Sequence, residues 1–277
     1  MSFVPAIPAS GLLGLRVLDQ TFDRQVERFA ARPEIARDAA DFVERAGTLT
    51  SAAELVADRA LLNVALSAFG LEEELPKRAL IRKVLEDGAD NPQGLATRLV
   101  DPAWKRFARA FDFSAGPPMA TLEARRTITQ AFEVRQFERA VGELDVDLRL
   151  ALNFRREIEL LVQEEGTDQS KWFRAIGSRP LRTVLFGALG VPESAGALDV
   201  DLLADRLQDR SQSVFASSSL SVFSSPDEVE KAVRLFLQRR SIESVPTSGG
   251  NTALQLLGAP AVSAPTISGL LEAFVQS

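Results

Sequence analysis

The 277-residue sequence contains neither histidine nor cysteine. Histidine is the usual general base near neutral pH, so its absence excludes Ser-His-Asp and Cys-His catalytic systems. Without histidine and cysteine the common tetrahedral zinc sites cannot be built, and disulfide bonds are excluded as well. The lack of cysteine suits a cytoplasmic protein and an exported one equally, so it does not decide the compartment.

Other features with a chemical meaning are also missing. The sequence has no Ser-x-x-Lys spacing and no glycine-rich phosphate-binding pattern, because Gly11 and Gly14 alone are too weak a signal. No apolar run approaches the roughly 20 residues needed to span a membrane. The N-terminus has two prolines and no basic segment, so we expect no secretory signal there. We therefore expect no cofactor, no metal and no transmembrane segment.

The charge balance argues against two classes of partner. Lysine and arginine number 32 and aspartate and glutamate 38, which gives a net charge of −6. Nucleic acids and anionic membranes are bound by basic surfaces, so neither is an expected partner.

The apolar residues follow a helical period. Leu15, Leu18, Phe22, Val26 and Phe29 fall on one face of a helix, and similar stripes recur along the chain. Alternation with a period of two is never sustained, and tyrosine, which favours strands, is absent. The predicted fold class is all-α.

Two similar stretches are predicted to form central helices. The first, residues 58–71, reads DRALLNVALSAFGL, and the second, residues 178–191, reads SRPLRTVLFGALGV. Each is apolar on nearly every side, as in a helix buried within a bundle. Gly70 and Gly190 are placed where a left-handed residue ends a helix, and Asp58 and Ser178 where an N-cap is expected.

Further matches in the same order predict an internal duplication. RQVERF resembles RQFERA, ADFVERAGT resembles LNFRREIEL, and Ile81, Leu85 and Asp87 correspond to Leu203, Leu207 and Asp209. We predict two diverged copies of one multi-helix module, joined at SAGPP and followed by a flexible C-terminal tail. The predicted boundaries are an irregular segment at 1–14, modules at 15–113 and 119–240, a linker at 114–118 and a tail at 241–277.

The tail ends in a short amphipathic pattern. Residues 241–264 are rich in serine, glycine, alanine and proline, which is typical of a linker. Ile267, Leu270, Leu271 and Phe274 then recur at helical spacing. A helix this short is marginal in water, so we expect its apolar stripe to bind a protein partner or a second copy of the chain. A frayed chain end is the alternative.

Four aspartates are the remaining candidates for chemistry. Asp145 with Asp147, and Asp199 with Asp201, form D-x-D pairs that could hold a hard cation or serve an enzyme acting through carboxylates. Both pairs open predicted helices, where acidic side chains complement the helix dipole. We favour this helix-start interpretation over a metal site.

Several blocks of the sequence resemble a family of alphaproteobacterial proteins of unassigned biochemical function. The blocks lie within residues 10–240 and include ADRALLNVALSAFGLEEE, LATRLVDPAWKRFARAFDF and KWFRAIGSRPLRTVLFGALGVP. Members of that family are encoded among flagellar basal-body and motor genes, and some are labelled flagellar basal-body proteins. The resemblance implies an all-helical protein tied to the flagellum and to motility, and it implies no catalytic residues.

Together these observations predict a non-enzymatic helical scaffold or a chaperone-like protein that binds a flagellar component. We expect a cytoplasmic location, with association to the flagellum as an open alternative. Two other hypotheses remain open, an enzyme that uses Asp145, Asp147, Asp199 and Asp201, and an exported flagellar structural subunit.

Overall fold

The computed structural model describes residues 4–243, and this part of the chain is built from helices without a strand. The prediction of an all-α fold is confirmed. Residues up to Ser241 form one compact unit. The α-helices are α1 (Gly11–Ala30), α2 (Pro33–Arg45), α3 (Ala52–Ala57), α4 (Arg59–Phe69), α5 (Arg78–Asp87), α6 (Leu95–Arg98), α7 (Ala103–Ala110), α8 (Leu122–Leu144), α9 (Val146–Gln163), α10 (Asp168–Gly177), α11 (Arg179–Leu189), α12 (Val200–Phe215) and α13 (Pro226–Glu243). Short 3-10 helices are η1 (Ala46–Thr48), η2 (Glu72–Glu74), η3 (Glu193–Ala197) and η4 (Leu220–Ser224).

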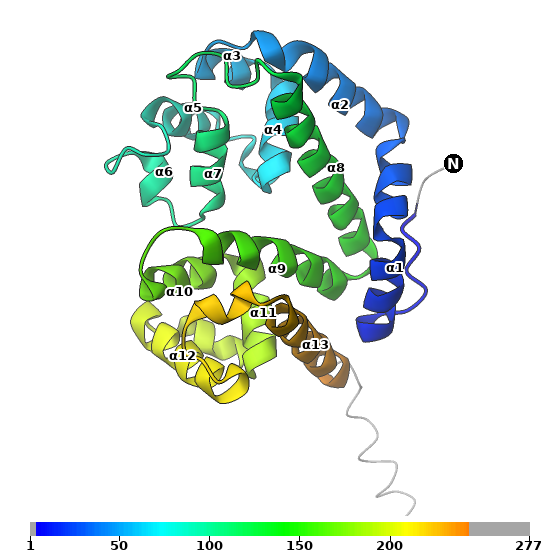
Figure 1. Ribbon diagram of the computed structural model, residues 1–277, viewed down its shortest axis with the longest axis vertical. Helices are drawn as coiled ribbons and strands as arrows, with labels where there is room; N and C mark the ends of the chain where they lie inside the picture. The colour runs from blue at the N-terminus through cyan, green and yellow to red at the C-terminus, as the bar shows by residue number, and fades with distance from the viewer. Residues whose placement is uncertain (1–3, 244–277) are drawn as a thin grey trace, which may run out of the picture. The chain divides into compact units, whose positions relative to one another are not determined.

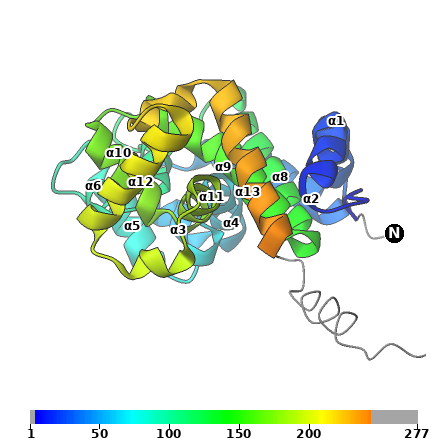
Figure 2. The ribbon, with the colours of Figure 1, turned by 90° about the horizontal axis from the view of Figure 1, so that it is seen from below.

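Helix α4 lies at the centre of the first half of the chain, as its sequence predicts. Leu62 and Leu66 are fully buried in it. The helix packs chiefly against the long helix α8 and also against α2 (Figure 1). Helix α9 follows α8 after a sharp turn and packs against α8, α11 and η4 (Figures 1 and 2). The buried apolar residues of both halves form one continuous cluster, so the two predicted modules share a single core.

The ends of the two central helices are set by the residues that the sequence indicates. Gly70 and Gly190 have φ values of 75° and 67°. This left-handed conformation is accessible to glycine at little cost and ends a helix. The backbone N–H of the next residue, Leu71 or Val191, then donates to a carbonyl of the last helical turn over 2.9 Å. At the N-terminus, Asp58 caps α4 through the amides of residues 60 and 61, whereas Ser178 makes no side-chain cap on α11.

The predicted irregular segment 1–14 is too long. Helix α1 begins at Gly11, four residues before the predicted start. Gly14 lies inside this helix. A glycine is needed there because the carbonyl oxygen of Ala9 occupies the position that a Cβ atom would take. The amide side chain of Gln25 then holds the segment before α1, since its Oε1 accepts from the backbone N–H of Ala6 over 2.7 Å. The close approach of the segment before α1 to the helix therefore explains why residue 14 is a glycine.

The predicted boundary of the tail is also too early, because residues 241–243 continue α13. The predicted linker 114–118 lies in the non-helical connection between α7 and α8. The serine-rich stretch after α12 is folded as well. The indole N–H of the buried Trp172 donates to the carbonyl of Ser218 over 3.0 Å, and the apolar residues Leu220 and Phe223 of η4 are buried.

The two halves share a local order of elements. Helices α3 and α4 meet at Asp58, and α10 and α11 meet at Ser178. A 3-10 helix and a further α-helix follow in each half, η2 with α5 and η3 with α12. These correspondences agree with a duplication, while the superposition of residues 15–113 on 119–240 stays a prediction.

Candidate functional site

The four aspartates considered for chemistry serve as helix starts. Asp145 caps α9 by accepting from the N–H of Leu148 over 3.0 Å. Asp199 caps α12 by accepting from the N–H of Asp201 over 2.9 Å. Asp147 forms an ion pair of 3.0 Å with the Nε of Arg240. Within residues 4–243 no three carboxylates are grouped in a way that could hold a metal ion, and the helix-start interpretation accounts for their positions.

The residues proposed from sequence for partner binding, Ile267, Leu270, Leu271 and Phe274, lie outside the described residues. The structure instead shows a groove that runs along α9. Its cavity volume is about 770 Å³. It is lined also by the end of α4, by η2 and the start of α7, and by the first turns of α11 and η3. We call it the α9 groove and define it by its lining residues: Phe69 to Glu74, Asp101, Ala103, Trp104, Arg135, Val146, Arg149, Leu150, Asn153, Glu157, Ser178, Arg179, Pro180, Arg182, Thr183, Glu193 and Arg240.

Helix α9 presents one face to the groove. Its lining residues are spaced by three or four positions, from Val146 through Leu150 and Asn153 to Glu157, which places them in a row along the helix. This row extends over 11 residue steps, or about 16 Å at the helical rise per residue. The groove is therefore long enough to accept an extended peptide segment or a short helix.

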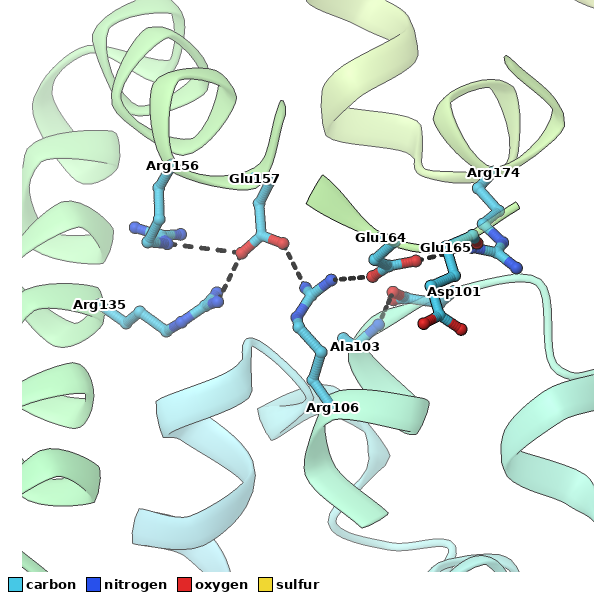
Figure 3. A network of polar contacts seen from close by, with 9 residues as sticks. All are labelled: Asp101, Ala103, Arg106, Arg135, Arg156, Glu157, Glu164, Glu165 and Arg174. Carbon is cyan, nitrogen blue, oxygen red and sulfur yellow. Dashed lines mark hydrogen bonds and ion pairs between the residues drawn. The ribbon is translucent and has the colours of Figure 1, made fainter. Parts of the chain in front are cut away.

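A network of ion pairs is centred on Glu157, at one end of the row that α9 presents to the groove (Figure 3). The carboxylate of Glu157 is paired with the guanidinium groups of Arg106 and of Arg135, the latter over 2.5 Å. Arg106 also pairs with Glu164 over 3.1 Å, and Glu164 pairs in turn with Arg174 over 2.7 Å. The network ties α7, α8 and α10 to α9 and to Glu164, the residue that follows α9.

Burial and charge act in opposite directions on the acids of this network. Burial alone would raise the pKa of Glu157, but the guanidinium groups around it, that of Arg135 first, lower it below its usual value. Burial raises the pKa of Asp101, and the nearby charge of Glu157 adds to this shift. The N–H of Ala103, which donates to the carboxylate of Asp101 over 2.8 Å, opposes it. The charged form of Glu157 is thus stabilised by its surroundings, whereas the charged form of Asp101 is less favourable than in water.

Two residues of the groove lining, Glu72 and Asn153, each have one buried oxygen without a hydrogen-bond partner, Oε2 and Oδ1 respectively. Other charged side chains at the groove lack partners among the described residues. Arg149 and Arg179 make no hydrogen bond or ion pair there, and neither do the carboxylates of Glu73 and Glu193. A groove lined by unpaired charges of both signs is suited to binding a polar ligand.

The sequence matches a protein-family model over most of the residues that form the α9 groove. Residues 68–229 match the family described as "Protein of unknown function (DUF1217)". The chain belongs to this family. The matched residues include every residue that lines the α9 groove except Arg240. The groove is therefore a feature of the family's domain in this chain.

A solved structure has a similar fold. The X-ray crystal structure of the protein AGR_C_984 from Agrobacterium tumefaciens aligns with a TM-score of 0.72 and 23% sequence identity, covering 88% of this chain and 98% of that one. At this identity the likeness concerns the fold. No curated protein matches the sequence.

Sequence reasoning missed the groove because its members are distant in the chain. Arg106 and Glu157 are separated by 51 residues, and Glu72 and Asn153 come from different halves of the molecule. In the sequence, EEE at residues 72–74 is a run of charge and SRP at residues 178–180 indicates a helix start. No spacing within either block shows that they face the same cavity.

Proposed function

We propose that this member of the family is a non-enzymatic helical scaffold or chaperone-like protein that binds a component of the bacterial flagellum during its assembly or operation. The α9 groove is the observation that supports a binding role. It combines aromatic and aliphatic side chains with both signs of charge, and its size fits a segment of protein chain.

The flagellar setting of the proposal rests on the resemblance to a family encoded among flagellar genes. A location in the cytoplasm, with association to the flagellum, follows from the same resemblance. Within the described residues no helix is long and apolar enough to cross a membrane.

The alternative of an enzyme that uses Asp145, Asp147, Asp199 and Asp201 has less support. Such an enzyme would need these carboxylates to converge on one cavity, and none of the four lines the α9 groove. The groove instead favours recognition, since it is lined by aromatic, aliphatic and charged side chains.

Affinity purification of the tagged chain from a flagellated host tests the proposal. We expect a flagellar protein to be recovered with it, and we expect a deletion strain to swim less well. Recovery of no flagellar protein, together with normal motility of the deletion strain, would refute the proposal. Cell fractionation would test the location separately.

A further inference from the structure

Two arginines from different helices meet at the end of α11. The Nε of Arg210, on α12, donates to the carbonyl of Leu189 over 2.9 Å. The Nη1 of Arg239, on α13, donates to two further carbonyls in the last turn of α11. Their Nη2 atoms lie 3.3 Å and 3.1 Å from the point that a Cβ atom of Gly190 would occupy. The two guanidinium groups are therefore neighbours, and they are accessible because Arg210 and Gly190 are exposed.

Capping the end of α11 uses only part of the donor capacity of these arginines. Among residues 4–243, Nη1 and Nη2 of Arg210 and Nε and Nη2 of Arg239 have no hydrogen-bond partner, and neither arginine forms an ion pair. Two like charges held close together repel each other unless a counter-charge lies nearby. The negative end of the α11 dipole is equivalent to roughly half an elementary charge, so it offsets only part of the two positive charges.

The first half of the chain shows how such a charge is neutralised. Gly70 ends α4 as Gly190 ends α11, and both glycines have the left-handed conformation. The guanidinium group of Arg135, from α8, lies against Gly70. Its Nη2 pairs with the carboxylate of Glu157 over 2.5 Å. At Gly190 no carboxylate of the described residues takes this place, so the second half repeats the arginine without its acidic partner.

We propose that Arg210 and Arg239 together bind the carboxylate of an acidic side chain on a partner protein, an inference that rests on the proposed function and adds a contact outside the α9 groove. Neither arginine lines that groove. The two oxygens of one carboxylate can accept from both guanidinium groups, and such charge-assisted hydrogen bonds are stronger than neutral ones. A singly charged carboxylate suits the site better than a phosphate, because the negative end of α11 lies beside it. An exposed ion pair alone is weak, so the carboxylate needs the further contacts that a protein partner brings.

Titration of the isotope-labelled chain with a blocked tripeptide tests this inference without knowledge of the partner. The probe is acetyl-Ala-Glu-Ala amide, the uncharged control is acetyl-Ala-Gln-Ala amide, and inorganic phosphate is the third ligand. The backbone N–H signal of Gly190 in an NMR spectrum reports the site. The signal of Gly70 is the internal reference, because the arginine beside it is already paired.

We expect the glutamate peptide to shift the Gly190 signal in a saturable way, with little change at Gly70. The glutamine peptide should bind at least about threefold more weakly, and so should the glutamate peptide to Arg210→Gln or Arg239→Gln, because an ion pair is lost. Phosphate should bind no more tightly than the glutamate peptide. Arg234→Gln is the matched control and should bind like the unmodified chain, since Arg234 is an exposed arginine of α13 without a partner among the described residues.

No saturable shift at Gly190, equal binding of the two peptides, tighter binding of phosphate, or undiminished binding by folded Arg210→Gln and Arg239→Gln would each overturn the inference. Arg210 is exposed, so its replacement should leave a folded variant even if that of Arg239 does not. A flagellar protein recovered equally by the unmodified chain and by Arg210→Gln would also overturn the inference, but it would leave the proposed function standing. Failure of the proposed function gives a different result, in which the peptide binds at Gly190 and no flagellar protein is recovered.

Discussion

Glu157 is the residue on which the charges of the groove floor converge. Its buried carboxylate faces the guanidinium groups of Arg106, Arg135 and Arg156. Glu157→Gln keeps the size of the side chain but leaves buried cations without their counter-charge. We expect it to lower the free energy of unfolding by about 2–4 kcal/mol at pH 7. Chemical denaturation measures the loss, and the exposed change Glu123→Gln should stay within about 0.5 kcal/mol.

The pH dependence of that loss has a definite sign. The pKa of Glu157 is lower in the folded protein than its ordinary value of 4.5. A lowered carboxyl pKa contributes stability that is present above the unfolded pKa and is lost as the pH falls through the folded pKa. The difference between the unmodified chain and Glu157→Gln should therefore be constant near neutral pH and shrink below about pH 4.5. A difference that grows on acidification would show that the arginines do not stabilise this carboxylate.

Removing the charge of Asp101 should have the opposite effect on stability from removing the charge of Glu157. Burial raises the pKa of Asp101, so its charged form is less favourable in the folded state than in the unfolded state. Asp101→Asn removes the charge and keeps an oxygen that can accept from the N–H of Ala103. We expect the variant to be as stable as the unmodified chain or more stable by up to about 1 kcal/mol at pH 7, with the gain decreasing as the pH is lowered. Denaturation curves at several pH values measure this, and a loss above about 1 kcal/mol would contradict it.

At the scale of elements, α11 and α13 are in such close contact that a glycine is required between them. A Cβ atom at Gly187 would lie 2.5 Å from Cδ2 of Phe236, which is fully buried. Alanine favours a helix over glycine by about 1 kcal/mol, but overpacking a core costs about 1–3 kcal/mol. We expect Gly187→Ala to be destabilising overall and to lower the melting temperature. The exposed change Gln212→Ala on α12 is the control, and a raised melting temperature for Gly187→Ala would show that the two helices can separate at little cost.

Local signals in the sequence predicted the ends of several elements. Asp58 caps the start of α4, and Gly70 and Gly190 end α4 and α11 in the left-handed conformation. Each of these ends is decided by one residue. The start of α1 was predicted wrongly because Gly14 is required by a backbone segment that packs against it, and that contact has no local signal.

At the scale of the molecule, residues up to Ser241 form one unit rather than two separable modules. Helix α8 belongs to the second predicted module, yet it packs chiefly on α4 of the first. We therefore expect thermal unfolding to be a single cooperative transition, with calorimetric and van't Hoff enthalpies that agree. A fragment of residues 119–241 should not fold alone, because the face of α8 that covers α4 would be exposed. Two resolved transitions would contradict this prediction.

The sequence alone predicted less of the candidate site than of the fold. Periodicity reports which face of a helix is buried, but it does not report which helices meet. The α9 groove depends on contacts such as that between Arg106 and Glu164, which are 58 residues apart. The aspartates that did stand out in the sequence, Asp145 and Asp199, proved to be helix caps.

The central claim is that this protein binds a flagellar component through the α9 groove. Its most direct test is the recovery of partner proteins from a flagellated host by the unmodified chain and by the folded double variant Arg149→Glu, Arg179→Glu, which reverses two unpaired charges of the groove lining. We predict that the unmodified chain recovers a flagellar protein and that the double variant recovers much less of it. Recovery of no flagellar protein by the unmodified chain would contradict the binding function, and equal recovery by both would contradict the groove as its site.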